Sequence, residues 1–184
     1  MSDGLAALAQ GVIQNNLIFM QGLGLYALTR WTKSLDTAVR AGLAVLATLF
    51  TASLALWMIE SLIFESFSLN IPFVIVIALL SALFWEKLLA KVWRPSEEGT
   101  LVSSLMNSAL VGVLLLMEPW GVEGSAVAGL GLAAGLGFAV GLVVMAGIRQ
   151  RLELSPVPKP LRGVPILLIS AGLVALALMG FRFS

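Results

Sequence analysis

Two short polar stretches interrupt long apolar segments of this chain. Gln14, Asn15 and Asn16 lie about a third to halfway into the first apolar segment, and Asn107 and Ser108 lie within the fourth. Amide and hydroxyl groups without hydrogen-bond partners are costly in an apolar medium, so these side chains should face protein or a cavity. Two interpretations stay open: hydrogen bonds between helices, or broken helices around a central site.

Glycines lie near both polar stretches and would ease a break in a helix. Corresponding interruptions in the first segment of each half are typical of transporters built from repeats, where unwound backbone lines the substrate path. The candidate central site therefore comprises Asn15, Asn16, Gly22, Gly24, Asn107, Ser108 and Gly112.

Other chemistry is restricted by what the sequence lacks. It has no Cys and no His, which excludes disulfides, thiolate-held clusters, imidazole ligation of haem and the usual zinc sites. We find no Ser/His/Asp set, no pair of buried carboxylates and no phosphate-binding glycine loop, so no catalytic residue is assigned. The sequence has no basic face or stripe of the kind that would predict binding to nucleic acid.

The composition predicts a membrane protein. Hydrophobic residues make up 59% of the chain and charged residues 11%, whereas soluble domains carry about 25% charge. Because about 20 apolar residues span a bilayer as a helix, divisions at charges and prolines predict an all-α fold with six transmembrane helices. The whole chain, 1–184, forms one integral membrane domain, with spans at about 5–28, 37–64, 72–93, 100–117, 125–148 and 164–183.

The basic residues predict the orientation of these spans. Ten of the 11 Lys and Arg residues fall in three clusters, at and around the loops that follow spans one, three and five. The positive-inside rule places these loops in the cytoplasm and both termini outside, as in a multi-pass inner-membrane protein. The clusters are Arg30/Lys33/Arg40, Lys87/Lys91/Arg94 and Arg149/Arg151/Lys159/Arg162.

The six spans divide into two halves of three, at about 1–94 and 99–184. Since three is odd, a repeated three-helix unit must be inverted in the membrane relative to its partner. A weak internal similarity agrees, because Ala38-Val39 and Phe50 recur as Ala126-Val127 and Phe138 at the same separation. Glycines throughout span five, including the Gly131/Gly135 pair, predict tight helix packing.

Three stretches resemble the Rnf/Nqr membrane-subunit family, most closely its RnfA/NqrE type, over essentially the whole chain. They are residues 15–25 (NNLIFMQGLGL), residues 107–113 (NSALVGV) and the tail from 148 to 181, whose VPKPLRG segment is the most specific part. The resemblance implies a six-helix inverted-repeat subunit, paired with a homologous RnfE/NqrD-type subunit inside a complex that couples electron transfer to ion movement.

The chain departs from that family at two positions. The family places a Cys after the Gly-Leu of span one and another after the Asn of span four, where the thiolates hold an iron-sulfur centre. Tyr26 and Ser108 occupy these positions here, and neither supplies a soft thiolate. We therefore expect no cofactor on this chain, while flavins and iron-sulfur clusters remain open for partner subunits.

The leading hypothesis is a non-catalytic membrane subunit of an Rnf/Nqr-like ion-translocating oxidoreductase complex. The alternative is a small secondary transporter or channel that uses the same inverted-repeat scaffold on its own. A third interpretation, an anchoring protein without a path, predicts that Asn15, Asn16 and Asn107 tolerate replacement by Leu.

Overall fold

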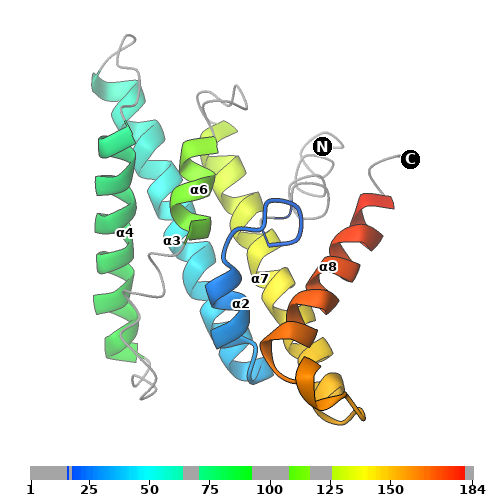
Figure 1. Ribbon diagram of the computed structural model, residues 1–184. Helices are drawn as coiled ribbons and strands as arrows, with labels where there is room; N and C mark the ends of the chain where they lie inside the picture. The colour runs from blue at the N-terminus through cyan, green and yellow to red at the C-terminus, as the bar shows by residue number, and fades with distance from the viewer. Residues whose placement is uncertain (1–15, 17, 64–70, 93–107, 117–125, 181–184) are drawn as a thin grey trace, which may run out of the picture.

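The computed structural model describes residues 16, 18–63, 71–92, 108–116 and 126–180, and all regular structure in these ranges is helical. This confirms the predicted all-α class. The elements, shown in Figure 1, are α2 (Leu25–Trp31), α3 (Leu35–Ile63), α4 (Ile71–Val92), α6 (Ser108–Leu116), α7 (Ala126–Glu153), the short 3-10 turn η2 (Lys159–Leu161) and α8 (Val164–Gly180).

Two long helices, α3 and α7, form the centre of the bundle (Figure 1). They contain 29 and 28 residues, and at ~1.5 Å per residue each is about 40 Å long. Leu35–Ile59 and Val127–Glu153 are long and apolar enough to cross a bilayer. These two helices correspond to the second and fifth of the predicted spans.

Close backbone contact joins α3 to α7. A Cβ at Gly42 would lie 2.9 Å from the Ala139 Cα, and one at Gly135 would lie 2.8 Å from the Leu46 Cα. Because the residue number rises along α3 as it falls along α7, the two helices are antiparallel. The glycines let the backbones approach as the small-residue pattern predicted, and they make this contact the most extensive in the described fold.

Helices α4 and α8 flank this pair on opposite sides, α4 against α3 and α8 against α7 (Figure 1). The Trp85 indole nitrogen donates to the Thr51 hydroxyl at 3.0 Å, which links α4 to α3. The outer faces of both flanking helices are apolar, with Leu80 60% exposed on α4 and Leu176 65% exposed on α8. Such faces suit lipid or another membrane subunit.

Helix boundaries differ from the predicted ones for identifiable reasons. Helix α3 begins at Leu35, before the predicted start at about 37: the Ser34 hydroxyl accepts the Thr37 backbone N–H at 3.2 Å, and Asp36 pairs with Arg40 at 2.9 Å. Helix α7 continues past residue 148 to Glu153, because an ion pair between positions four residues apart extends it into the polar end.

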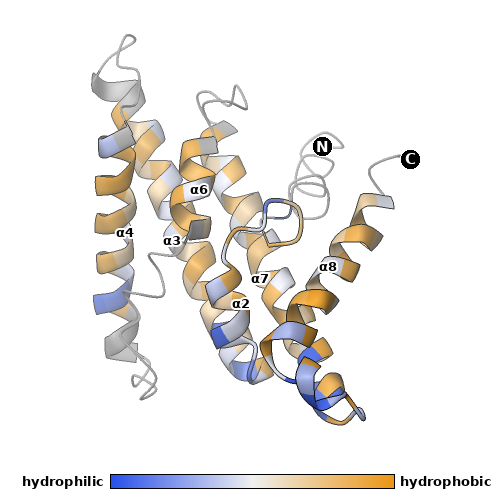
Figure 2. Ribbon diagram, in the orientation of Figure 1, coloured by the Kyte–Doolittle hydropathy of each residue, from blue (hydrophilic) through white to orange (hydrophobic). Residues whose placement is uncertain are grey.

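Hydrophilic residues gather at one end of the bundle, where α2 turns into α3, where α7 turns into η2, and towards the C-terminal end of α4 (Figure 2). The Arg149 Nη1 atom donates to the Thr29 carbonyl at 3.0 Å, which ties two of the basic loops directly together. Thus basic residues from distant parts of the sequence share one polar end.

Candidate functional site

The chain is not helical where it approaches the middle of the bundle before α2. Residues 18–24 form turns, and Gly22 and Gly24 have φ angles of 64° and 79°. These left-handed conformations are readily adopted only by glycine and are incompatible with a continuing right-handed helix. Helix α2 consequently begins at Leu25, with Gly24 as its N-cap, inside the predicted 5–28 span.

Asn16 fastens this non-helical segment to α7. Its side chain is 3% exposed, and its Nδ2 atom donates to the Gly137 carbonyl at 2.8 Å. Its Oδ1 atom accepts backbone N–H groups of Ile18 at 3.1 Å and Phe19 at 3.3 Å. One amide therefore satisfies donors of the turn and bridges the turn to the helix, which compensates for backbone bonds that the interruption removes.

A glycine on α7 makes room for this contact. A Cβ at Gly141 would lie 2.9 Å from the Ile18 side chain and 3.5 Å from the Asn16 Oδ1 atom. Gly137 and Gly141 thus face the segment before α2, whereas Gly131 and Gly135 face α3. Helix α7 presents two glycine surfaces to two different neighbours.

The turn before α2 also contacts the start of α6. A Cβ at Gly24 would lie 3.0 Å from the Phe138 Cζ atom and 3.5 Å from the Ala109 Cβ, and one at Gly112 would lie 2.6 Å from a Leu23 methyl carbon. The short helices α2 and α6, of 7 and 9 residues, therefore approach one another near their N-terminal ends (Figure 1). The buried ring of Phe138 lies against Gly24 at this place.

Tyr26 and Ser108, the two positions for which the resemblance implies thiolates, lie beside this contact. Tyr26 is two residues beyond Gly24 and is 54% exposed, and Ser108, the first residue of α6, precedes Ala109. Phenol and hydroxyl oxygens do not replace the thiolates that hold an iron-sulfur cluster. The residues at this site do not fit that group.

The structure describes five of the seven predicted site residues. The contacts above bring Asn16, Gly24 and Gly112 into one region, and the start of α6 puts Ser108 next to it. Gly22 lies in the same turn, but an added Cβ there would meet nothing within 4 Å. Asn15 and Asn107 lie outside the described residues.

Arg149 was not among the predicted site residues, yet it holds the other end of α2. Its Nη1 atom donates to the Thr29 carbonyl at 3.0 Å and to the buried Thr32 hydroxyl at 3.3 Å. A guanidinium group there satisfies a free carbonyl and complements the negative end of the helix dipole. The sequence showed only that Arg149 belongs to a basic cluster. Its hydrogen-bond acceptor, the Thr29 carbonyl, is 120 residues away and could not be predicted.

Phe138, Gly137 and Gly141 were also missed as parts of the site. The sequence predicted close packing for the glycines of span five without separating the residues that face α3 from those that face the turn. The spacing of Gly137 and Gly141 was the available signal, but a small-residue pair specifies contact and not a partner.

Its long apolar helices and glycine-packed core place the chain among helical membrane proteins. Residues 5–184 match the model of a family described as "Rnf-Nqr subunit, membrane protein". The chain belongs to this family.

Two curated relatives agree over nearly the whole length, and both are named as subunits of an ion-translocating oxidoreductase complex. The relative from Cereibacter sphaeroides is 35% identical over 191 residues, which cover 98% of this chain and 97% of the relative. The relative from Yersinia pseudotuberculosis, which carries the same name, is 34% identical over 189 residues, again with 98% and 97% covered.

Proposed function

We propose that this chain is an integral membrane subunit of an ion-translocating oxidoreductase complex, as the names of its relatives indicate for those proteins. The observation that carries the proposal is the non-helical turn before α2, which contains Gly22 and Gly24. A hydrogen bond from Asn16 holds this turn against α7, in a chain that belongs to this family. Interrupted backbone at this depth is tolerated in membranes where it is buried in protein or lines a cavity, and it commonly forms ion sites.

The proposed topology is a multi-pass inner-membrane protein with six spans, both termini outside, and inverted halves at about 1–94 and 99–184. Three arrangements support it. Helices α3 and α7 are antiparallel, α2 and α6 are both short and occupy corresponding places before them, and α4 and α8 flank opposite sides (Figure 1). The shared basic end supports a single cytoplasmic face.

The proposed role of this chain is to form part of the ion path and to support assembly of the complex, without a metal centre of its own. Tyr26 and Ser108 offer oxygen atoms where the family uses thiolates, so electrons would pass through flavins or iron-sulfur clusters of partner subunits. A homologous RnfE/NqrD-type subunit is the proposed membrane partner, and the exposed apolar faces of α4 and α8 are available to receive it.

Purification from native membranes tests the assignment. A tagged chain in mild detergent should bring with it a flavin-containing protein together with a homologous membrane subunit, detected by flavin fluorescence and mass spectrometry. Recovery as a lone protein that moves sodium ions or protons when reconstituted by itself would contradict the proposal and support the stand-alone transporter.

The central turn is tested by Asn16→Leu in that complex. Inverted membrane vesicles energised with NADH should lose uptake of radioactive sodium, or acidification reported by a dye, while the complex still assembles. Thr48→Val is the matched control, because it removes a buried hydroxyl that bonds to the Ala44 carbonyl of its own helix, at 2.7 Å. Equal ion uptake in the two variants would show that the turn has only a packing role.

A further inference from the structure

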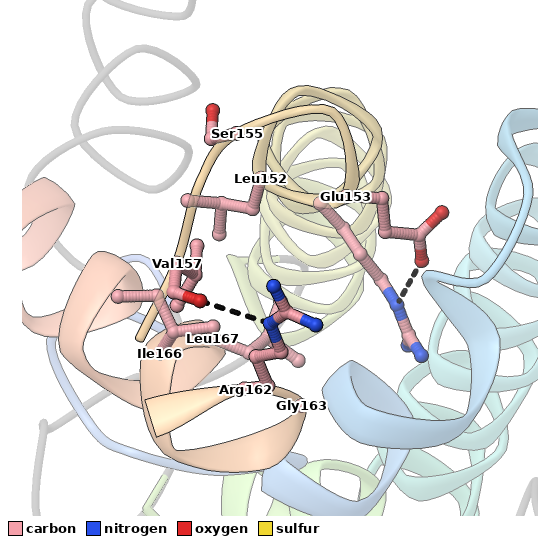
Figure 3. Close-up of a pocket in the computed structure, with 9 residues that line it drawn as sticks. Leu152, Glu153, Ser155, Val157, Arg162, Gly163, Ile166 and Leu167 are labelled. Carbon is pink, nitrogen blue, oxygen red and sulfur yellow. Dashed lines mark hydrogen bonds and ion pairs between the residues drawn. The ribbon is translucent and has the colours of Figure 1, made fainter. Parts of the chain in front are cut away.

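A cavity of about 290 Å³ opens at the polar end of the bundle, between the end of α7 and the start of α8 (Figure 3). Its size is near the lower limit of ligand pockets, at ~300 Å³, and suits a small headgroup. Two arginines, Arg149 and Arg162, line it together with one carboxylate, Glu153. The lining therefore carries an excess of positive charge.

Arg162 is positioned to receive an anion. Its Nε atom donates to the Val157 carbonyl at 2.9 Å, which holds the side chain over the cavity (Figure 3). In the described part of the chain, no hydrogen bond is made by its two terminal nitrogens. A guanidinium group fixed in this way offers a planar pair of donors that matches the oxygens of a phosphate.

Arg149 adds a second, less exposed positive charge. Its side chain is 24% exposed and is held by Thr29 and by Glu153, whose Oε1 atom lies 3.4 Å from the Arg149 Nε. The Glu153 side chain is 62% exposed, so solvent screens it more than the arginine. The carboxylate orients Arg149 and offsets one positive charge, and Arg162 leaves the lining with a net positive charge.

Much of the remaining wall of the cavity is apolar, with Ser155 as a further polar residue in the lining. Leu152, Ile166 and Leu167 line it, and α8 continues outward with exposed apolar residues such as Leu168 and Leu173. A free anion would gain nothing from this surface. A molecule with an anionic head and hydrocarbon chains would use both the arginines and the outer face of α8.

We propose that this cavity binds the phosphate headgroup of an anionic phospholipid, whose acyl chains lie along α8. The site is separate from the central turn, and its occupancy does not depend on the proposed role in electron transport.

The test compares lipid retention by the purified full-length protein and its variants. Native mass spectrometry should find phosphatidylglycerol retained by the wild type in preference to phosphatidylcholine, and added phosphatidylglycerol should raise the melting temperature. Arg162→Gln should weaken phosphatidylglycerol binding about tenfold. Arg162→Lys should fall between, because an ammonium group lacks the planar pair of donors. Lys159→Gln is the control, since this basic residue is on the same turn and does not line the cavity.

Three results would overturn the proposal. One is an equal loss of lipid in Lys159→Gln and Arg162→Gln, which would indicate nonspecific surface charge. Another is equal stabilisation by inorganic phosphate, which would indicate a free-anion site. The third is unchanged lipid retention in Arg162→Gln with loss of a partner from the native complex, which would make the cavity a protein-docking site.

Discussion

The α3–α7 pair and the turn before α2 both depend on glycine, but for different physical reasons. In the pair, Gly42 and Gly135 are helical, and an added Cβ would meet the backbone of the opposite helix. In the turn, Gly22 and Gly24 have positive φ angles, so an added Cβ strains the residue itself.

The neighbours that each region meets also differ. At Gly42 and Gly135 the nearest atoms include backbone atoms of the opposite helix, which cannot move without shifting that helix. In the turn, Gly24 instead meets the Phe138 ring and the Ala109 Cβ, and the Asn16 amide holds the turn to α7. We call the α3–α7 pair the frame and the turn before α2 the insert, because backbone contact joins the pair, whereas side chains make most of the contacts of the turn.

The largest effect should come from closing the α3–α7 contact. Gly135→Ala places a methyl group 2.8 Å from the Leu46 Cα, and the helices must separate, at a cost of about 1–3 kcal/mol. Gly147→Ala on the same helix meets nothing within 4 Å and should be neutral or stabilising. Thermal unfolding in detergent, followed by circular dichroism, measures both. Equal melting temperatures for the two variants would remove the distinction between frame and insert.

The sequence was sufficient for the helical class and the central membrane helices because these depend on hydrophobic length and composition. The predicted spans 37–64 and 125–148 correspond to α3 and α7 within a few residues. The ends were less predictable, since the N-cap at Ser34 and the extension to Glu153 depend on which side chain finds a partner.

The central region was predictable in its residue types and not in its contacts. Asn16, Gly22 and Gly24 stood out as polar or flexible residues in an apolar segment. The acceptor for Asn16 is the backbone carbonyl of Gly137, 121 residues away. Every residue has a backbone carbonyl, so the residue type at position 137 does not predict this hydrogen bond. Likewise, the ring that covers Gly24 comes from Phe138, which by sequence is an ordinary core residue.

A smaller effect should separate strain from crowding within the turn. Gly22→Ala, with nothing within 4 Å, should cost only the left-handed conformation, about 1 kcal/mol. Gly24→Ala should cost more, because its methyl group also meets the Phe138 ring. In a Phe138→Leu background, Gly24→Ala should lose the part of its destabilisation that comes from contact with the ring and keep the part that comes from the left-handed backbone conformation. The difference in unfolding free energy across this double-mutant cycle measures the contact, and a cycle without coupling would place the turn away from the ring.

The smallest effect should come from the contact between the turn and α6. Gly112→Ala meets the Leu23 side chain, 2.6 Å from its Cδ1 atom, and this flexible end can move aside. The cost should therefore stay below about 1 kcal/mol, because the gain in helix propensity offsets part of the crowding. In a Leu23→Ala background the same substitution should become neutral or stabilising, as measured by thermal unfolding of the four variants. A cost for Gly112→Ala as large as that for Gly135→Ala would show that α6 is held by rigid backbone contact, and the insert would then belong to the frame.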